Sequence, residues 1–69
     1  MNEHKYKINK SVVRKAMLWQ GLKIGEVAKK SKIHRCTLYR ILYTDDRFRA
    51  STVGKLATGL GVKSEDLIE

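Results

Sequence analysis

The sequence predicts an all-α domain built from five short helices, and three observations support this. In successive segments the apolar residues recur three and four positions apart, the spacing of a helix that buries one face. Gly21 and Gly61 follow two of these segments, where a left-handed residue commonly ends a helix. The 69 residues contain no proline and few glycines, so no linker is marked. One domain with one small core is expected, without a substantial sheet.

The first helix is expected to run from Asn9 or Ser11, whose short side chains can cap it, to about Gln20. Its apolar residues lie near one face: Val12, Val13, Ala16 and, near them, Trp19. Residues 1–8 precede the helix as a basic N-terminal arm. For this arm a mobile terminus and a short edge strand are both open interpretations.

Two further helices, Ile24–Ser31 and His34–Leu42, are expected to meet at the turn Ser31-Lys32-Ile33. Four apolar residues point inward from the pair: Val27, Ala28, Leu38 and Ile41. The third helix leaves a basic and aromatic set outside: His34, Arg35, Cys36, Tyr39 and Arg40. Residues 43–49 then form a polar loop in which Phe48 is the expected anchor.

A fourth helix is expected from Ala50 or Ser51 to Leu60. Its buried stripe follows the three-and-four spacing: Val53, Leu56, Ala57 and Leu60. Ser64 is expected to cap a final turn, with acidic residues behind it where a helix N-terminus favours them. Leu67 or Ile68 would pack that turn against the core.

The net charge of +8 is large for this length and is unevenly distributed. Between Lys5 and Arg40 eleven lysines and arginines face a single acid, Glu26. A cationic surface attracts polyanions, so DNA, RNA and anionic lipid are the physical candidates, beside a charged surface that only maintains solubility. Lipid is disfavoured because no helix combines a broad apolar face with a basic one. Nucleic acid is the favoured partner.

Two stretches resemble the Cro/CI-repressor type of helix-turn-helix domain, the XRE-like family. The first is GLKIGEVAKKSKIHRCTLYRI, beginning at Gly21, and the second is VGKLATGLGVKSEDL, beginning at Val53. The first is similar to the family pattern GLTQEELAxxxGVSxxTISxI, and the second to its fourth helix and closing turn. The resemblance implies that residues 9–69 form a lambda-repressor-like DNA-binding domain with a central helix-turn-helix.

The resemblance also implies where such a domain would contact a double-stranded DNA operator. The family's base-reading positions, with their neighbours, fall on His34, Arg35, Cys36, Tyr39 and Arg40. An arginine suits this role because its guanidinium can donate two hydrogen bonds to guanine. Phosphate contacts would come from Lys23, Lys29, Lys30 and Lys32, each of which is equally well explained as a solvated surface charge. Family members often bind palindromic operators as dimers, so a homodimer is one expected arrangement.

Several departures from the family pattern suggest a second function. Ile24 stands where the family usually has a glutamine, Lys32 replaces the turn glycine, and Met17 and Leu42 replace an arginine–glutamate pair. Simple repacking of an apolar pair explains the last of these. The alternative is an exposed apolar patch that binds a protein: Trp19, Ile24, Leu42 and Tyr43. Small temperate-phage proteins that act as antirepressors bind a phage repressor and mask its DNA-reading surface, which gives this patch a partner.

Catalysis is not expected, because His4, His34 and Cys36 are the only candidate nucleophiles, bases or soft metal ligands. His34 and Cys36 are two positions apart on a helix and do not face each other. No metal site or cofactor is therefore expected. The lone cysteine fits a reducing compartment, and the apolar runs are too short for a membrane span or a signal peptide. The expected location is the cytoplasm of a bacterial host, with a role in a phage lysis–lysogeny switch.

Overall fold

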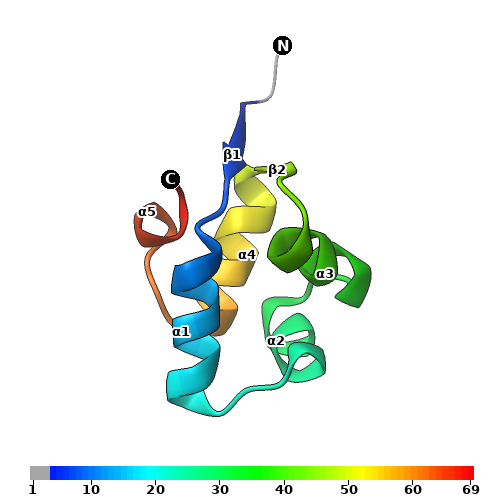
Figure 1. The fold of residues 1–69 in the computed structure, drawn as a ribbon, viewed down its shortest axis with the longest axis vertical. Helices are drawn as coiled ribbons and strands as arrows, with labels where there is room; N and C mark the ends of the chain where they lie inside the picture. The colour runs from blue at the N-terminus through cyan, green and yellow to red at the C-terminus, as the bar shows by residue number, and fades with distance from the viewer. Residues whose placement is uncertain (1–3) are drawn as a thin grey trace.

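The computed structural model describes residues 4–69, which form five helices and one two-stranded sheet (Figure 1). The elements in chain order are β1 (Lys5–Lys7), α1 (Lys10–Gln20), α2 (Ile24–Ser31), α3 (Arg35–Tyr43), β2 (Arg47–Arg49), α4 (Ala50–Leu60) and α5 (Ser64–Leu67). The prediction of a small domain with five helices is confirmed. Residues 1–3 of the predicted arm lie outside the described residues.

Helix α4 runs through the middle of the domain, with α1 and α5 on one side and α2 and α3 on the other (Figure 1). The largest fully buried side chains come from all five helices: Val13, Val27, Leu38, Ile41, Leu56, Leu60 and Leu67. They form one continuous apolar cluster. The helical spacing of the sequence therefore identified the core-facing side of each of the first four helices.

Local chemistry fixes where the helices begin and end. The Asn9 side chain accepts a hydrogen bond from the Ser11 backbone amide and caps α1. Gly21 and Gly61 adopt left-handed φ angles of 64° and 73° at the ends of α1 and α4. Ser64 does not cap α5 as predicted, because it is the first helical residue and Lys63 occupies the cap position without a side-chain bond.

The closest approach between helices brings α2 against α4. A Cβ atom added to Gly59 would lie 2.8 Å from the Cα atom of Ser31 and closer still to the Ser31 hydroxyl. Ser31 is 2% exposed, and its hydroxyl has no hydrogen-bond partner among the described residues. The position therefore requires glycine on α4 and a small residue on α2.

The turn between α2 and α3 contains a lysine in the left-handed conformation, which usually favours glycine. Lys32 has φ 56° and ψ 37°, and in residues 4–69 no other non-glycine residue has a positive φ. The amides of Lys32 and Ile33 bond back to the carbonyls of Lys29 and Ala28, which closes the end of α2. A left-handed conformation costs an L-residue about 1 kcal/mol relative to glycine, so this turn is conformationally strained.

The sheet corrects part of the sequence-based description. β1 pairs antiparallel with β2. A separate isolated bridge joins Ile8, just after β1, to Ile68 near the C-terminus. The arm is thus an edge strand over Lys5–Lys7, one of its two predicted forms. The predicted loop at residues 43–49 is wrong at both ends, since α3 extends to Tyr43 and β2 occupies Arg47–Arg49.

We expect Gly59→Ala to destabilise the domain by about 1–3 kcal/mol, because the new methyl group would overlap the backbone of Ser31. The measurement is urea unfolding followed by circular dichroism. Gly54→Ala in the same helix is the matched control, since nothing lies within 4 Å of its added Cβ. It should stabilise the helix by about 0.5–1 kcal/mol. Equal effects of the two substitutions would contradict the close approach.

Candidate nucleic-acid interface

Helix α3 divides its residues cleanly between the core and solvent. Leu38, Ile41 and Leu42 are buried. Six residues at or near the other side are exposed: His34, Arg35, Cys36, Tyr39, Arg40 and Tyr43. The outward side is therefore polar, aromatic and cationic, as the sequence predicted for residues 34–40.

His34 is the residue that caps α3 and is not its first helical residue. Its Nδ1 atom accepts a hydrogen bond of 3.3 Å from the backbone amide of Cys36. This bond fixes the ring against the start of the helix and leaves Nε2 as the free polar atom of the ring. His34 can thus contact a ligand at the helix start only through Nε2.

Arg35 lies over the first turn of α2. A Cβ atom added to Gly25 would lie 2.6 Å from Arg35 Nη2, so the guanidinium occupies the space that this glycine leaves. Among the described residues, no carboxylate forms an ion pair with Arg35. Its charge and its hydrogen-bond donors are available to a ligand at the junction of α2 and α3.

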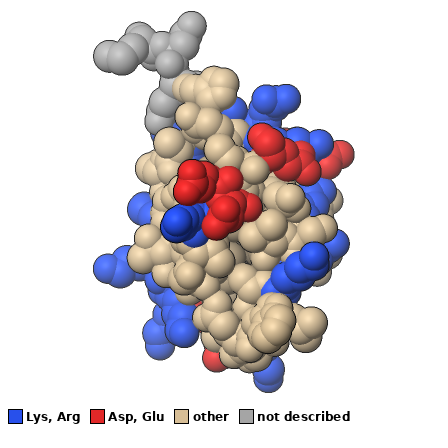
Figure 2. All heavy atoms as spheres, turned by 90° about the vertical axis from the view of Figure 1, so that its left-hand side faces the viewer, with Lys and Arg blue, Asp and Glu red and all other residues tan. Residues whose placement is uncertain are grey.

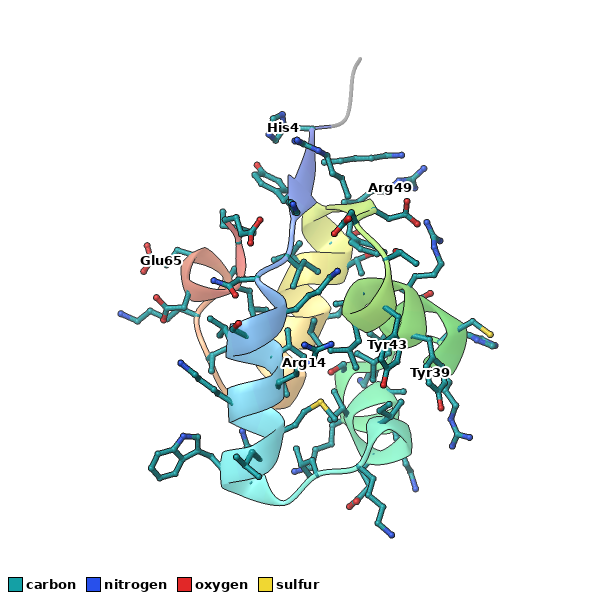
Figure 3. The ribbon with its side chains drawn as sticks, viewed as in Figure 1. His4, Arg14, Tyr39, Tyr43, Arg49 and Glu65 are labelled. Atoms are coloured by element: carbon teal, nitrogen blue, oxygen red, sulfur yellow. The ribbon has the colours of Figure 1, made fainter. Side chains whose placement is uncertain are left out.

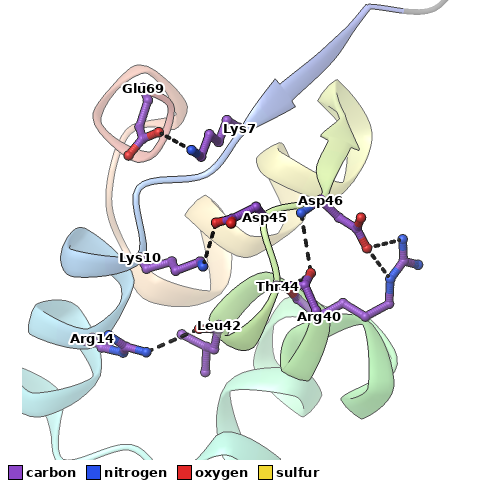
Figure 4. Close-up of polar contacts among 9 residues, drawn as sticks. All are labelled: Lys7, Lys10, Arg14, Arg40, Leu42, Thr44, Asp45, Asp46 and Glu69. Atoms are coloured by element: carbon purple, nitrogen blue, oxygen red, sulfur yellow. Dashed lines mark hydrogen bonds and ion pairs between the residues drawn. The ribbon is translucent and has the colours of Figure 1, made fainter.

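Arg40 is engaged within the protein. Its Nε and Nη2 atoms donate to Asp46 Oδ2 at 3.2 and 3.1 Å (Figure 4), and its guanidinium lies 5.5 Å from the centre of the Phe48 ring. The side chain is still 58% exposed. The bonds to Asp46 occupy the Nε–H and one Nη2–H donor and fix the orientation of the guanidinium, which the sequence did not reveal. The remaining N–H donors of Arg40 are still available to a ligand.

The two tyrosines of α3 form an exposed stacked pair. The rings of Tyr39 and Tyr43 lie 5.9 Å apart with an interplanar angle of 23° (Figure 3). Tyr39 is 44% exposed and Tyr43 is 65% exposed. The sequence placed Tyr39 among the base-reading neighbours and Tyr43 in an apolar patch, and the structure brings the two side chains together.

The four predicted phosphate-binding lysines do not form one cluster. Lys23 precedes α2, where its backbone amide donates to Glu26. Lys29 and Lys30 lie in the last turn of α2, where the helix dipole favours cations. Lys30 and Lys32 also line a polar hollow together with Lys55 of α4. Stabilisation of the helix end is therefore a sufficient local reason for two of these charges.

A set of contacts missed by the sequence reasoning fixes the C-terminal end of α3 (Figure 4). Arg14 of α1 donates to the carbonyl of Leu42 at 3.2 Å, and Lys10 pairs with Asp45 at 3.1 Å. The Thr44 hydroxyl donates to the carbonyl of Arg40. The bond from Arg14 satisfies a carbonyl at the end of the helix, and together with the Lys10–Asp45 pair it ties the orientation of α3 to α1. These contacts join residues that lie about thirty positions apart, so no local pattern in the sequence predicted them.

The predicted apolar patch needs a correction. Leu42 is only 4% exposed and belongs to the core, because it follows Leu38 by four positions on the inward side of α3. Ile24 is half-buried. Trp19 and its neighbour Leu18, which the sequence analysis overlooked, are 86% and 82% exposed. Leu18, Ile24 and Tyr43 border one apolar hollow between α1 and α3.

The charges are not spread evenly over the surface. Figure 2 shows the side of the molecule formed by α1 and α5, where acidic residues gather in the upper part and lysines and arginines lie mainly at the margins. Glu65 and Asp66 of α5 lie in this region of the fold. The acidic residues on the side formed by α1 and α5 make that side unsuitable for binding a polyanion (Figure 2).

None of the helices in residues 4–69 has the length and hydropathy needed to cross a membrane. Within the same residues, His, Cys, Asp and Glu form no group of three that could hold a metal ion. Neither a protein-family model, nor a curated protein, nor a solved structure matches the chain. The function must therefore be argued from the residues themselves.

The contact between α1 and the end of α3 predicts a pH effect. A hydrogen bond from Lys10, with the positive charges of Lys10 and Lys7, lowers the pKa of Asp45 from its usual value of 3.8. Because the folded-state pKa is depressed, this contact stabilises the fold at pH above about 4 and loses its effect as the pH falls through the pKa of Asp45.

We expect Lys10→Met to raise the pKa of Asp45 toward 3.8, which a carboxyl-carbon NMR titration would measure. The residual influence of Lys7 should keep the value slightly low. Lys15→Met, on an exposed position of the same helix, is the control and should leave the titration unchanged. An unchanged Asp45 titration in Lys10→Met would show that the pair does not form.

Proposed function

We propose that the chain is a sequence-specific DNA-binding transcriptional regulator of the Cro/CI-repressor type. In this proposal α2 and α3 form the helix-turn-helix, and α3 lies in the major groove. The observation that carries it is the outward side of α3, where the guanidinium of Arg35 has no ion-pair partner in residues 4–69. Two helices joined by the tight turn at Lys32 present this side to solvent.

The side chains would have different tasks. Arg35 is the leading base-reading residue, because it can donate two hydrogen bonds to a guanine without first losing a carboxylate. Arg40 would read a base with the donors that its bonds to Asp46 leave over. His34, Cys36 and Tyr39 would border the base edges. Phosphate contacts would come from the predicted lysines: Lys23, Lys29, Lys30 and Lys32.

The biological setting follows from the resemblance. Small Cro-like proteins of temperate phages bind operators in the bacterial cytoplasm and decide between lysis and lysogeny. Two copies on a palindromic operator would place their α3 helices one turn of DNA apart. A homodimer therefore belongs to the proposal, and no cofactor is required.

The proposal predicts that Arg35→Ala relaxes base preference at one position of the operator half-site. The loss should be about 1–3 kcal/mol of discrimination, the value of one bidentate contact to guanine. Selection of bound sequences from a randomised duplex pool, with wild type and variant in parallel, measures it. Arg40→Ala should have a smaller effect, because Asp46 already takes two of the donors of Arg40 and leaves fewer for a base.

Lys29→Gln is the companion variant for a phosphate contact. It should reduce the slope of log affinity against log salt by about 0.9 and leave the selected sequence unchanged. If Arg35→Ala only weakens binding uniformly over all sequences, Arg35 is not a base-reading residue. Failure of the wild-type protein to enrich any sequence would contradict the proposed function itself.

A second function, that of an antirepressor, is favoured by one specific observation. Leu18 and Trp19, consecutive residues at the end of α1, expose two large apolar side chains, and Leu18 borders the hollow that Ile24 and Tyr43 also line. An apolar surface of this kind suits a protein partner better than a phosphate backbone. The partner would be a phage repressor whose DNA-reading surface becomes covered.

The antirepressor function predicts that the fluorescence of Trp19, the only tryptophan, shifts to shorter wavelength on titration with the DNA-binding domain of a cognate phage repressor. Burial of an exposed indole produces this shift. Leu18→Lys with Trp19→Lys should abolish co-elution of the two proteins, whereas Ser11→Lys, exposed on the same helix, should not. An unshifted Trp19 spectrum with the repressor in excess would exclude this function.

A further inference from the structure

The sheet between β1 and β2 carries four cations on a single face. Its register places Lys5 opposite Arg49 and Lys7 opposite Arg47. Side chains alternate along a strand, and directly opposed residues of an antiparallel pair share a face. Tyr6 and Phe48 form the third opposed pair, and they are half-buried and buried. We call the outward set the cationic sheet face: Lys5, Lys7, Arg47 and Arg49.

Two pairs of like charges therefore lie directly opposite each other in a sheet of three residues per strand. Such pairs oppose strand association. Lys7 is partly compensated by Glu69 at 3.6 Å. Lys5 and Arg47 have no ion pair among the described residues. The packing of Tyr6 and Phe48 needs no charge on the other face, so Lys5 and Arg47 have no evident role in the stability of the sheet.

The cationic sheet face is continuous with α3. One hollow is lined by Lys5, Arg47 and Arg49 of the sheet, by Thr37 and Arg40 of α3, and by Thr52 of α4. Figure 3 shows Arg49 on the side of the molecule that carries α3. No described residue that lines the hollow is acidic, although Arg40 is bonded to Asp46 at its border.

The start of α4 adds to the positive potential of the hollow. β2 leads directly into this helix of eleven residues, and Arg49 is its cap residue. No side chain accepts the cap hydrogen bond, and the first turn carries no acid. The amides of a helix start attract anions, which here adds to the positive charge of Lys5 and Arg47.

We propose that the cationic sheet face binds the sugar–phosphate backbone of duplex DNA, beside the groove that takes α3. This inference rests on the proposed DNA-binding function and adds a second contact surface to it. Opposed cations that repel each other in the free protein become favourable when phosphates lie between them. The face would add affinity and salt dependence without reading bases.

The test uses the double variant Lys5→Gln with Arg47→Gln. It removes one cation from each opposed pair, and leaves Lys7 with Glu69 and Arg49 at the start of α4. Because it relieves both repulsions, the melting temperature should stay equal or rise, so a loss of binding cannot be attributed to unfolding. The control, Lys15→Gln with Lys63→Gln, removes the same charge from the α1 and α5 side.

Binding to one short duplex of mixed sequence is measured by fluorescence anisotropy over a series of salt concentrations. The slope of log affinity against log salt should fall by about 2 in the sheet variant and change by less than half of that in the control. Sequences selected from a randomised pool should be the same as for the wild type.

Equal slopes for the sheet variant and the wild type, with the wild type still binding DNA, would overturn the inference and leave the proposed function standing. That result is also the one expected if the sheet face binds an acidic protein segment instead. A wild-type protein that binds no duplex at low salt would overturn both.

Discussion

The close approach of α2 to α4 at Ser31 and Gly59 is the contact on which the rest of the domain depends. It brings the backbones of two helices together with only the small Ser31 side chain between them, which requires glycine at position 59. The next residue, Lys32, turns the chain, and α3 begins three positions later. The direction in which α3 points from the domain is therefore set by how deeply α2 sits on α4.

The other end of α3 is fixed by charge. Arg14 and Lys10 of α1 bond to Leu42 and Asp45, and Arg40 is held by Asp46 over Phe48. Part of the positive charge that suggested a polyanion partner thus maintains the fold. These contacts leave the net charge at +8, but they hold Lys10, Arg14 and Arg40 in place within the fold. Arg35, Lys5 and Arg47 are cations near α3 and the sheet that have no ion pair among the described residues.

The helices could be predicted to within a few residues because periodicity and the stop glycines are local signals. The pairing of the sheet could not, since it joins two segments of three residues whose paired positions lie forty or more residues apart. Trp19 was placed near the core because it follows Ala16 by three positions. At the end of α1, however, it is Gln20 that bonds to the carbonyl of Leu60, while Leu18 and Trp19 face outward. Leu42 shows the opposite error, where a family pattern outweighed its four-residue spacing from Leu38.

The opposed cations of the sheet also bear on how the chain completes its fold. Closing β1 onto β2 requires a long loop to be ordered, and mutual repulsion must be overcome at the same time. Whatever screens these charges, whether dissolved salt or a bound polyanion, stabilises the paired state over the open one by mass action. The stability of β1, which pairs with a strand forty or more residues away, thus depends on the ionic surroundings of the protein.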